Sequence, residues 1–106
     1  MSSRIHITGM GIISAIGPSV DDTLRSLQNC STGIKPITHL QTRHKNDFVV
    51  GEVPFSNMEL AEMASVQPFN RTTLLGMIAA GEAIKSAGIE NVDEARTGFI
   101  SSTTVA

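Results

Sequence analysis

Apolar residues recur at two different spacings along this 106-residue chain, and the spacings predict an alternation of strands and helices. Residues 5–16 hold six isoleucine and methionine side chains at both odd and even positions. Such a run is typical of a strand that is buried on both faces. Because Gly9 and Gly11 interrupt it, we predict a strand that bends at these two glycines.

Two segments carry the start signals of helices. Ser19 is an expected N-cap, with Asp22 three residues later, and this helix should end by Gly33. Ser56 and Glu59 make a second possible capping box, which opens a short helix that ends before Pro68.

Residues 70–87 form the most regular predicted helix, with Asn70 as N-cap. Its two faces differ in the size of their side chains. One face carries Leu74, Met77, Ile78 and Ile84, and the other carries Ala79, Ala80, Ala83 and Ala87. Small side chains let a neighbouring element approach closely, so we expect this helix to be covered on two sides.

The remaining segments are predicted as a polar surface loop over residues 35–47, a short strand over 48–53, an acidic turn over 90–94 and a final strand over 97–105. The order of elements favours an α/β fold with crossover helices and a mostly parallel sheet. These elements hold more apolar faces than they can cover for one another. We therefore expect an exposed apolar face on the 70–87 helix or the last strand.

Composition and charge narrow the class of protein. The length suits a single unit without a second domain, and the net charge is −2 with eight scattered Lys and Arg residues. This argues against nucleic-acid and anionic-membrane partners. One cysteine and no long apolar run predict a reducing, cytoplasmic setting with no membrane span.

The glycine turn at Gly9 and Gly11 raises the possibility of a phosphate site between a strand and a helix. A dinucleotide fingerprint needs a third glycine at position 14, where the chain has Ser14, and an acidic residue about 20 positions further on, which is absent. A structural bend is the favoured interpretation, and a small nucleotide-binding domain stays as an alternative.

The single cysteine and the three histidines do not form a complete catalytic or metal site. Cys30 follows the first predicted helix, where the helix dipole opposes a thiolate, so we interpret it as a small filler. His6 is expected to be a hydrogen-bonded core or edge residue of the first strand. His39 and His44 are expected to be solvated in the polar loop. We predict no metal and no cofactor.

The polar residues from Ser101 to Thr104 crowd the end of the last predicted strand, which is where α/β proteins place ligands. The same residues could instead mark the emergence of the strand into solvent. Both interpretations stay open on the residues alone.

The order of these motifs resembles the opening of the β-ketoacyl-acyl-carrier-protein synthases, condensing enzymes of the thiolase-like fold. The first motif matches at Thr8, Gly9, Gly11, Ser14 and Gly17. Further similar segments are Ser31 to Ile34, Thr38 to Thr42, Val50 to Val53, Asn70-Arg71, Ser86 to Ile89 and Arg96 to Gly98.

The resemblance implies the N-terminal portion of a ketosynthase domain with an α-β-α-β-α layered fold and a mostly parallel mixed sheet. It implies carbon–carbon bond formation between acyl and malonyl thioesters of acyl carrier protein, in a homodimer or heterodimer. The catalytic cysteine and histidines of the family map to no residue of this chain, so the chain alone is expected to be inactive. Thr104 and Val105 are implied contacts to the acyl chain.

Three departures from the family pattern leave other classes open. Ala15 stands where proline is usual, Asn70 where aspartate is usual, and residues 101–105 replace a glycine-rich run. The alternatives are a chain-length-factor-like partner without a nucleophile and a free-standing α/β interaction module.

Overall fold

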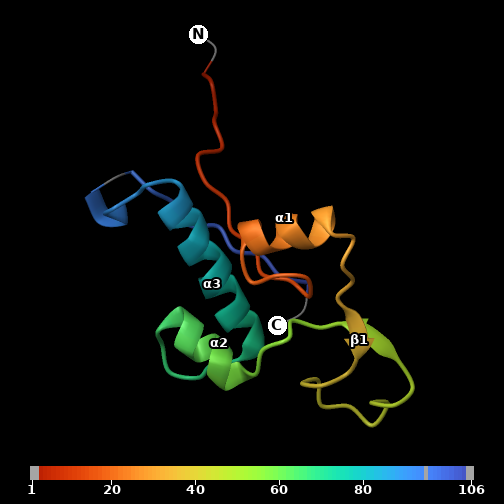
Figure 1. The fold of residues 1–106 in the computed structure, drawn as a ribbon. Helices are drawn as coiled ribbons and strands as arrows, with labels where there is room; N and C mark the ends of the chain where they lie inside the picture. The colour runs from red at the N-terminus through yellow and green to blue at the C-terminus, as the bar shows by residue number, and fades with distance from the viewer. Residues whose placement is uncertain (1–2, 95, 105–106) are drawn as a thin grey trace.

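The computed structural model describes residues 3–94 and 96–104, which hold three α-helices, a 3-10 turn and a two-stranded sheet (Figure 1). The elements are α1 (Val20–Gln28), β1 (Ile34–Pro36), β2 (Val49–Gly51), α2 (Asn57–Ala64), α3 (Arg71–Ser86) and η1 (Val92–Glu94). Within these residues, no helix has the length and apolar character needed to cross a membrane.

The predicted helix starts of α1 and α2 are confirmed. The Ser19 hydroxyl accepts a hydrogen bond from the backbone N–H of Asp22 at 3.1 Å. Ser56 and Glu59 form a full capping box, because the backbone N–H of each donates to the side chain of the other, at 2.7 and 3.2 Å. These bonds satisfy N–H groups that have no partner inside a helix.

The core lies between α2 and α3 (Figure 1). Leu60 and Ala61 of α2 and Leu74 of α3 are buried, and both leucines have no exposed surface. The side chain of Asn70 accepts a hydrogen bond from the Thr73 N–H at 2.8 Å and caps α3. Seven partly buried apolar residues surround this core: Ile13, Val53, Phe55, Ala64, Val66, Leu75 and Ile78.

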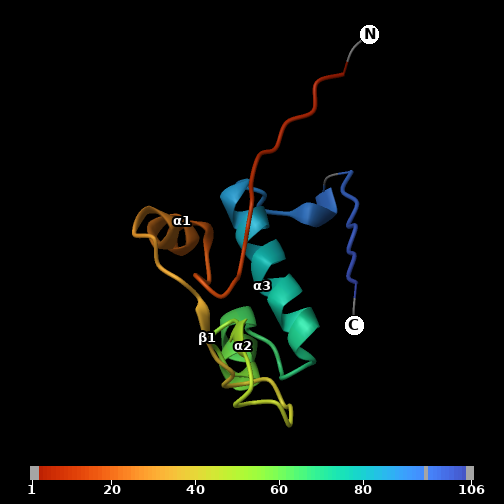
Figure 2. The ribbon, with the colours of Figure 1, turned by 90° about the vertical axis from the view of Figure 1, so that its right-hand side faces the viewer.

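The first predicted strand, over residues 5–16, is wrong for the described structure. This segment is extended but forms no strand, and its only pairing is an isolated bridge between Ser14 and Gly17. A strand requires a neighbour that accepts and donates its backbone hydrogen bonds. Figure 2 shows the N-terminal end of the segment running away from the helices, and the described sheet, β1 with β2, does not include it. Ile5 is consequently 94% exposed.

The last predicted strand, over residues 97–105, is not formed within the described part, residues 96–104. The segment runs extended beside α3 (Figure 2) and has no sheet partner among the described residues. Ile100 is 96% exposed. Its neighbour is a helix, which has no free row of backbone groups to pair with.

The sheet that the structure describes is antiparallel. β1 pairs with β2 in a register that joins Ile34 to Gly51 and Pro36 to Val49. β2 confirms the strand predicted over residues 48–53, whereas the pairing of β1 was not predicted. The mostly parallel sheet is not formed by the described residues, because β1 and β2 are joined by a loop rather than a crossover helix.

The N-terminal segment crosses α3 at a very short distance. A Cβ atom added to Gly9 would lie 2.5 Å from the backbone nitrogen of Ala87, and one added to Gly11 would lie 2.9 Å from that of Ala83. Real Cβ atoms do not approach this closely. The two glycines therefore serve a close approach, and the prediction that the small face of α3 admits a neighbour is confirmed.

The structure exposes more surface than a compact domain of its mass. Its accessible area is 8677 Å², whereas a compact monomer of this mass exposes about 5,700 Å². Its radius of gyration is 16.3 Å, against about 13 Å for a compact domain of this length. The predicted exposed apolar surface is confirmed, with Phe99 81% exposed and Met77 and Ile84 of α3 each about 40% exposed.

Candidate functional site

A groove of about 720 Å³ lies between the first half of α3 and the extended segment that ends the chain. Its lining combines hydroxyl and amide groups with apolar side chains. The residues are Asn70, Thr72, Thr73, Gly76, Met77, Ala80, Phe99, Ile100, Ser101, Ser102 and Thr103. No Asp, Glu, His, Lys, Arg or Cys is among these described lining residues, so the groove can bind an amphipathic ligand but offers no general acid or base to activate its hydroxyls.

The structure brings the polar cluster at the end of the chain to this groove only in part. Ser101, Ser102 and Thr103 line it together with Thr72 and Thr73 of α3. Among the described residues the lining ends at Thr103, and Thr104 is exposed beside it. Val105, the other predicted contact to a ligand, lies outside the described residues.

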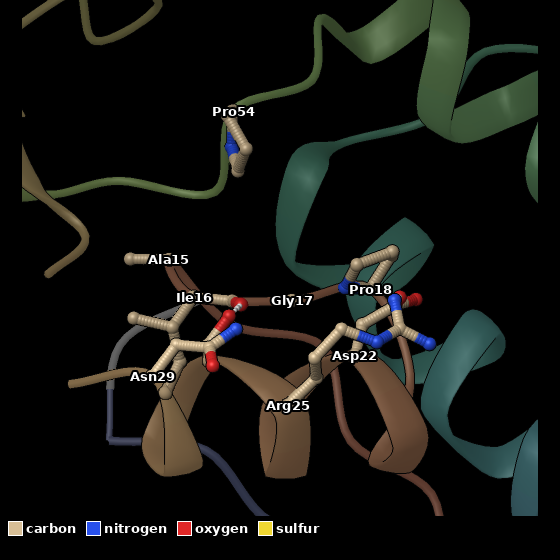
Figure 3. Close-up of a pocket in the computed structure, with 9 residues that line it drawn as sticks. Ala15, Ile16, Gly17, Pro18, Asp22, Arg25, Asn29 and Pro54 are labelled. Atoms are coloured by element: carbon tan, nitrogen blue, oxygen red, sulfur yellow. Dashed lines mark hydrogen bonds and ion pairs between the residues drawn. The ribbon is translucent and has the colours of Figure 1, made fainter. Parts of the chain in front are cut away.

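A second, smaller pocket of about 330 Å³ lies where the Ala15 to Pro18 segment passes over α1 (Figure 3). Asp22 and Arg25 project from α1 into this region and form an ion pair of 3.1 Å. The Ser26 hydroxyl donates to the Ile16 carbonyl at 2.6 Å. These bonds occupy the Asp22 carboxylate and the Ser26 hydroxyl, and they leave most of the Arg25 N–H groups facing solvent.

Glu52 fixes the first turn of the loop between β1 and β2. Its carboxylate accepts hydrogen bonds from the backbone N–H groups of Thr38, His39 and Leu40 at 2.7–3.0 Å. Desolvation by burial raises the pKa of Glu52. The hydrogen bonds from the backbone N–H groups of His39, Thr38 and Leu40, together with the electrostatic effect of His39, lower this pKa by more than burial raises it. The net pKa lies below the ordinary glutamate value. The carboxylate is therefore a structural clamp at neutral pH.

The three histidines do not converge on a site. His44 contacts Asp47 at 2.9 Å and the edge of the Phe48 ring, and both partners of the His44–Asp47 pair are exposed. His39 binds Glu52 through its backbone. His6 is exposed, which corrects the prediction of a core or edge histidine, because the strand that was to bury it is not formed. In residues 3–94 and 96–104, no cluster of His, Cys, Asp and Glu could hold a metal.

Cys30 is an exposed residue at the turn that follows α1. Its backbone has a left-handed φ of 53°, and its N–H donates to the Leu27 carbonyl at 3.1 Å. The turn follows the end of α1 at Gln28, five residues before Gly33. The prediction that Cys30 lies at the end of the first helix is confirmed. The prediction that it fills a small space in the packing is wrong, because Cys30 is exposed.

Sequence reasoning missed the long-range polar contacts. Arg71 donates to the Val53 carbonyl at 2.6 Å, the Phe55 carbonyl at 2.8 Å and the Asn57 side chain at 3.1 Å. These bonds tie the start of α3 to the connection between β2 and α2 and to the first residue of α2. Glu52 lies in the predicted strand over residues 48–53 and Arg71 follows the N-cap Asn70, and no local pattern at either position predicts partners 12 to 18 positions away.

Comparison with known proteins identifies relatives along nearly the whole chain. The family model described as the N-terminal domain of β-ketoacyl synthase matches residues 2–106. The chain is 31% identical over 90 residues to a 3-oxoacyl-acyl-carrier-protein synthase 2 of Staphylococcus aureus. The aligned region covers 84% of this chain and 22% of the relative. It is 27% identical over 99 residues to a 3-oxoacyl-acyl-carrier-protein synthase 1 of Haemophilus influenzae, covering 92% of this chain and 24% of the relative.

The alignments cover nearly all of this chain but only a small part of each relative. The chain spans about a fifth to a quarter of the length of the curated relatives it matches. No solved structure matches it at a significant level.

Proposed function

Because the chain belongs to the β-ketoacyl synthase family, we propose that it forms the N-terminal part of a 3-oxoacyl-acyl-carrier-protein synthase. The carrying observation is the family match over residues 2–106, joined to coverage of only about a fifth of the relatives' length. In this proposal the full protein is a cytoplasmic acyltransferase of fatty-acid or polyketide chain elongation. Its substrates are acyl and malonyl thioesters of acyl carrier protein.

The excess exposed surface supports the proposal that further polypeptide covers this unit. Ile5 and Ile100 lie in extended segments that leave their side chains almost fully exposed. Apolar side chains in extended backbone are suited to the interior of a sheet between two helical layers. We propose that these two segments become strands of a mostly parallel, thiolase-like sheet when the rest of the protein, in a homodimer or heterodimer, is present.

The chemistry of decarboxylative condensation requires groups that this chain does not assemble. A cysteine thiolate must attack the acyl thioester, and hydrogen-bond donors must stabilise the enolate and oxyanion. Cys30 lies in an exposed turn at the C-terminal end of α1. We propose that the reacting cysteine and histidines belong to other parts of the enzyme and that this chain supplies scaffold.

The contribution of this chain to substrate binding is proposed at the end of the α3 groove. Met77, Phe99 and Ile100 give the groove an apolar wall, and Ser101 to Thr103 give it hydroxyl groups. Thr104 directly follows this lining and is exposed. We propose that Thr104 and Val105 contact the acyl chain near the boundary between subunits.

A condensation assay tests the proposal. The 106-residue chain, given acyl and malonyl thioesters of acyl carrier protein, should form no 3-oxoacyl product. A synthase whose own N-terminal segment is replaced by this chain should form product, because this chain would restore the scaffold. Turnover by the 106 residues alone would contradict the proposal, and so would a folded but inactive chimera.

A free-standing interaction module is the competing function class. Such a module should bury its apolar residues within one chain, and the accessible area of 8677 Å² weighs against it. A chain-length-factor-like partner is a second alternative, in which the full protein would lack the reacting cysteine. Activity of the full-length protein distinguishes it from a synthase, since a partner without a nucleophile would form no 3-oxoacyl product even where the chimera does.

A further inference from the structure

Glu82 joins two distant parts of the N-terminal segment to α3. Its carboxylate accepts the Ile12 N–H at 2.9 Å and the Val20 N–H at 2.8 Å, one on each oxygen. Ile12 and Val20 lie 70 and 62 positions before Glu82. One side chain thus satisfies two backbone donors at the two ends of a short stretch of chain.

The stretch between these donors, residues 12–20, is a loop that closes on itself. Ser14 and Gly17 form a two-way backbone bridge, with N···O distances of 2.9 and 3.4 Å. The residues from Ala15 to Pro18 form one wall of the 330 Å³ pocket (Figure 3). The Ser26 hydroxyl holds this wall to α1, and the Glu82 carboxylate holds the two ends of the loop to α3.

We propose that Glu82 is a positioning residue that closes the loop of residues 12–20 and sets the wall of this pocket against α3. The inference rests on these contacts alone and is independent of the proposed function. The other side-chain contacts of the loop lead elsewhere: the Ser26 hydroxyl ties Ile16 to α1, and Ser19 caps α1. Glu82 is the hydrogen-bonding side chain that relates the loop to α3.

The close approach of Gly11 to α3 makes this role geometrically specific. Gly11 lies against Ala79, which is one turn before Glu82, and against Ala83, which directly follows Glu82. This approach places the N–H of the next residue, Ile12, within hydrogen-bond distance of the Glu82 carboxylate. A glutamate carboxylate has two oxygen atoms, and each of them can accept one of the two hydrogen bonds. A glutamine side chain has one acceptor oxygen, and its NH2 group can only donate. The site therefore distinguishes glutamate from its nearest isostere.

The test measures amide hydrogen exchange by NMR on the 106-residue chain with E82Q and E82D, and with E62Q as a matched control on α2. In E82Q, the Ile12 or the Val20 amide should exchange at least about tenfold faster, because one of the two bonds loses its acceptor. E82D keeps two acceptors and should restore part of the protection at both amides. E62Q should leave both amides unchanged.

Amides within the helices separate positioning from general stability. The Leu74 N–H, bonded to Asn70 in α3, and the Thr23 N–H, bonded to Ser19 in α1, should keep their exchange rates in E82Q. Equal acceleration at Leu74 and Ile12 would overturn the proposal, since it would mean that Glu82 only stabilises the whole fold. Unchanged exchange at both Ile12 and Val20 would overturn it as well.

Discussion

At the scale of single residues, the two glycines of the N-terminal segment serve packing. The sequence alone predicted a bend at Gly9 and Gly11 and left a phosphate site as an alternative. In the structure both glycines lie against the backbone of α3, with no room for a Cβ atom. The absence of a side chain permits this close approach, whereas the structure describes no bend at residues 9–11, so the predicted bend is not confirmed.

We predict that G9A and G11A each lower the free energy of unfolding by about 1–3 kcal/mol, because the added methyl group forces the segment off α3. Urea denaturation measures this change. G81A is the matched control, since a Cβ at Gly81 meets nothing within 4 Å. It should raise stability by about 0.5–1 kcal/mol through helix propensity. Equal effects at positions 9, 11 and 81 would contradict the close-approach argument.

At the scale of elements, helix starts were predictable and strand pairing was not. Ser19, Ser56 and Asn70 cap their helices through partners three residues later, so a short window of sequence contains the whole interaction. The pairing of β1 with β2 depends instead on the loop that joins them. From its sequence, this loop could be predicted only as polar and irregular. Glu52 holds that loop from 12 to 14 positions away.

We predict that acid releases the start of the β1–β2 loop. Since the folded pKa of Glu52 lies below its ordinary value of 4.5, its stabilising contribution is complete above that value and is lost as the pH falls through the folded pKa. The backbone amide signals of Thr38, His39 and Leu40 should therefore move together below pH 4.5 in an NMR titration. In E52Q this common acid transition should disappear, whereas E62Q should keep it. Independent movement of the three amides in the parent chain would argue against the clamp.

At the scale of the whole molecule, the chain buries one small core and leaves large apolar surfaces exposed. α2 and α3 enclose Leu60 and Leu74, but α1 has no buried residue. Leu24 and Leu27 of α1 are more than half exposed, as are Ile5 and Ile100. An apolar surface of this kind favours contact with further protein.

We predict that the 106-residue chain binds a hydrophobic dye such as ANS under native conditions. Replacing Phe99 and Ile100 by serine should lower the dye fluorescence, because these side chains are 81% and 96% exposed in one segment. M58S removes a single exposed side chain from α2 and should change it less. Dye binding as weak as that of a compact protein would show that these surfaces are covered within one chain.

The sequence by itself determined the features whose interactions are local: three helices with their caps and the small face of α3. The order of motifs along the chain also determined the family. Tertiary structure decided whether apolar runs became strands, because pairing needs a neighbour that residues 5–16 and 96–104 lack among the described residues. It also decided the roles of Glu52, Arg71 and Glu82, whose partners lie 12 to 70 positions away. Caps act within one helical turn, whereas these contacts exist only after the chain has folded back on itself.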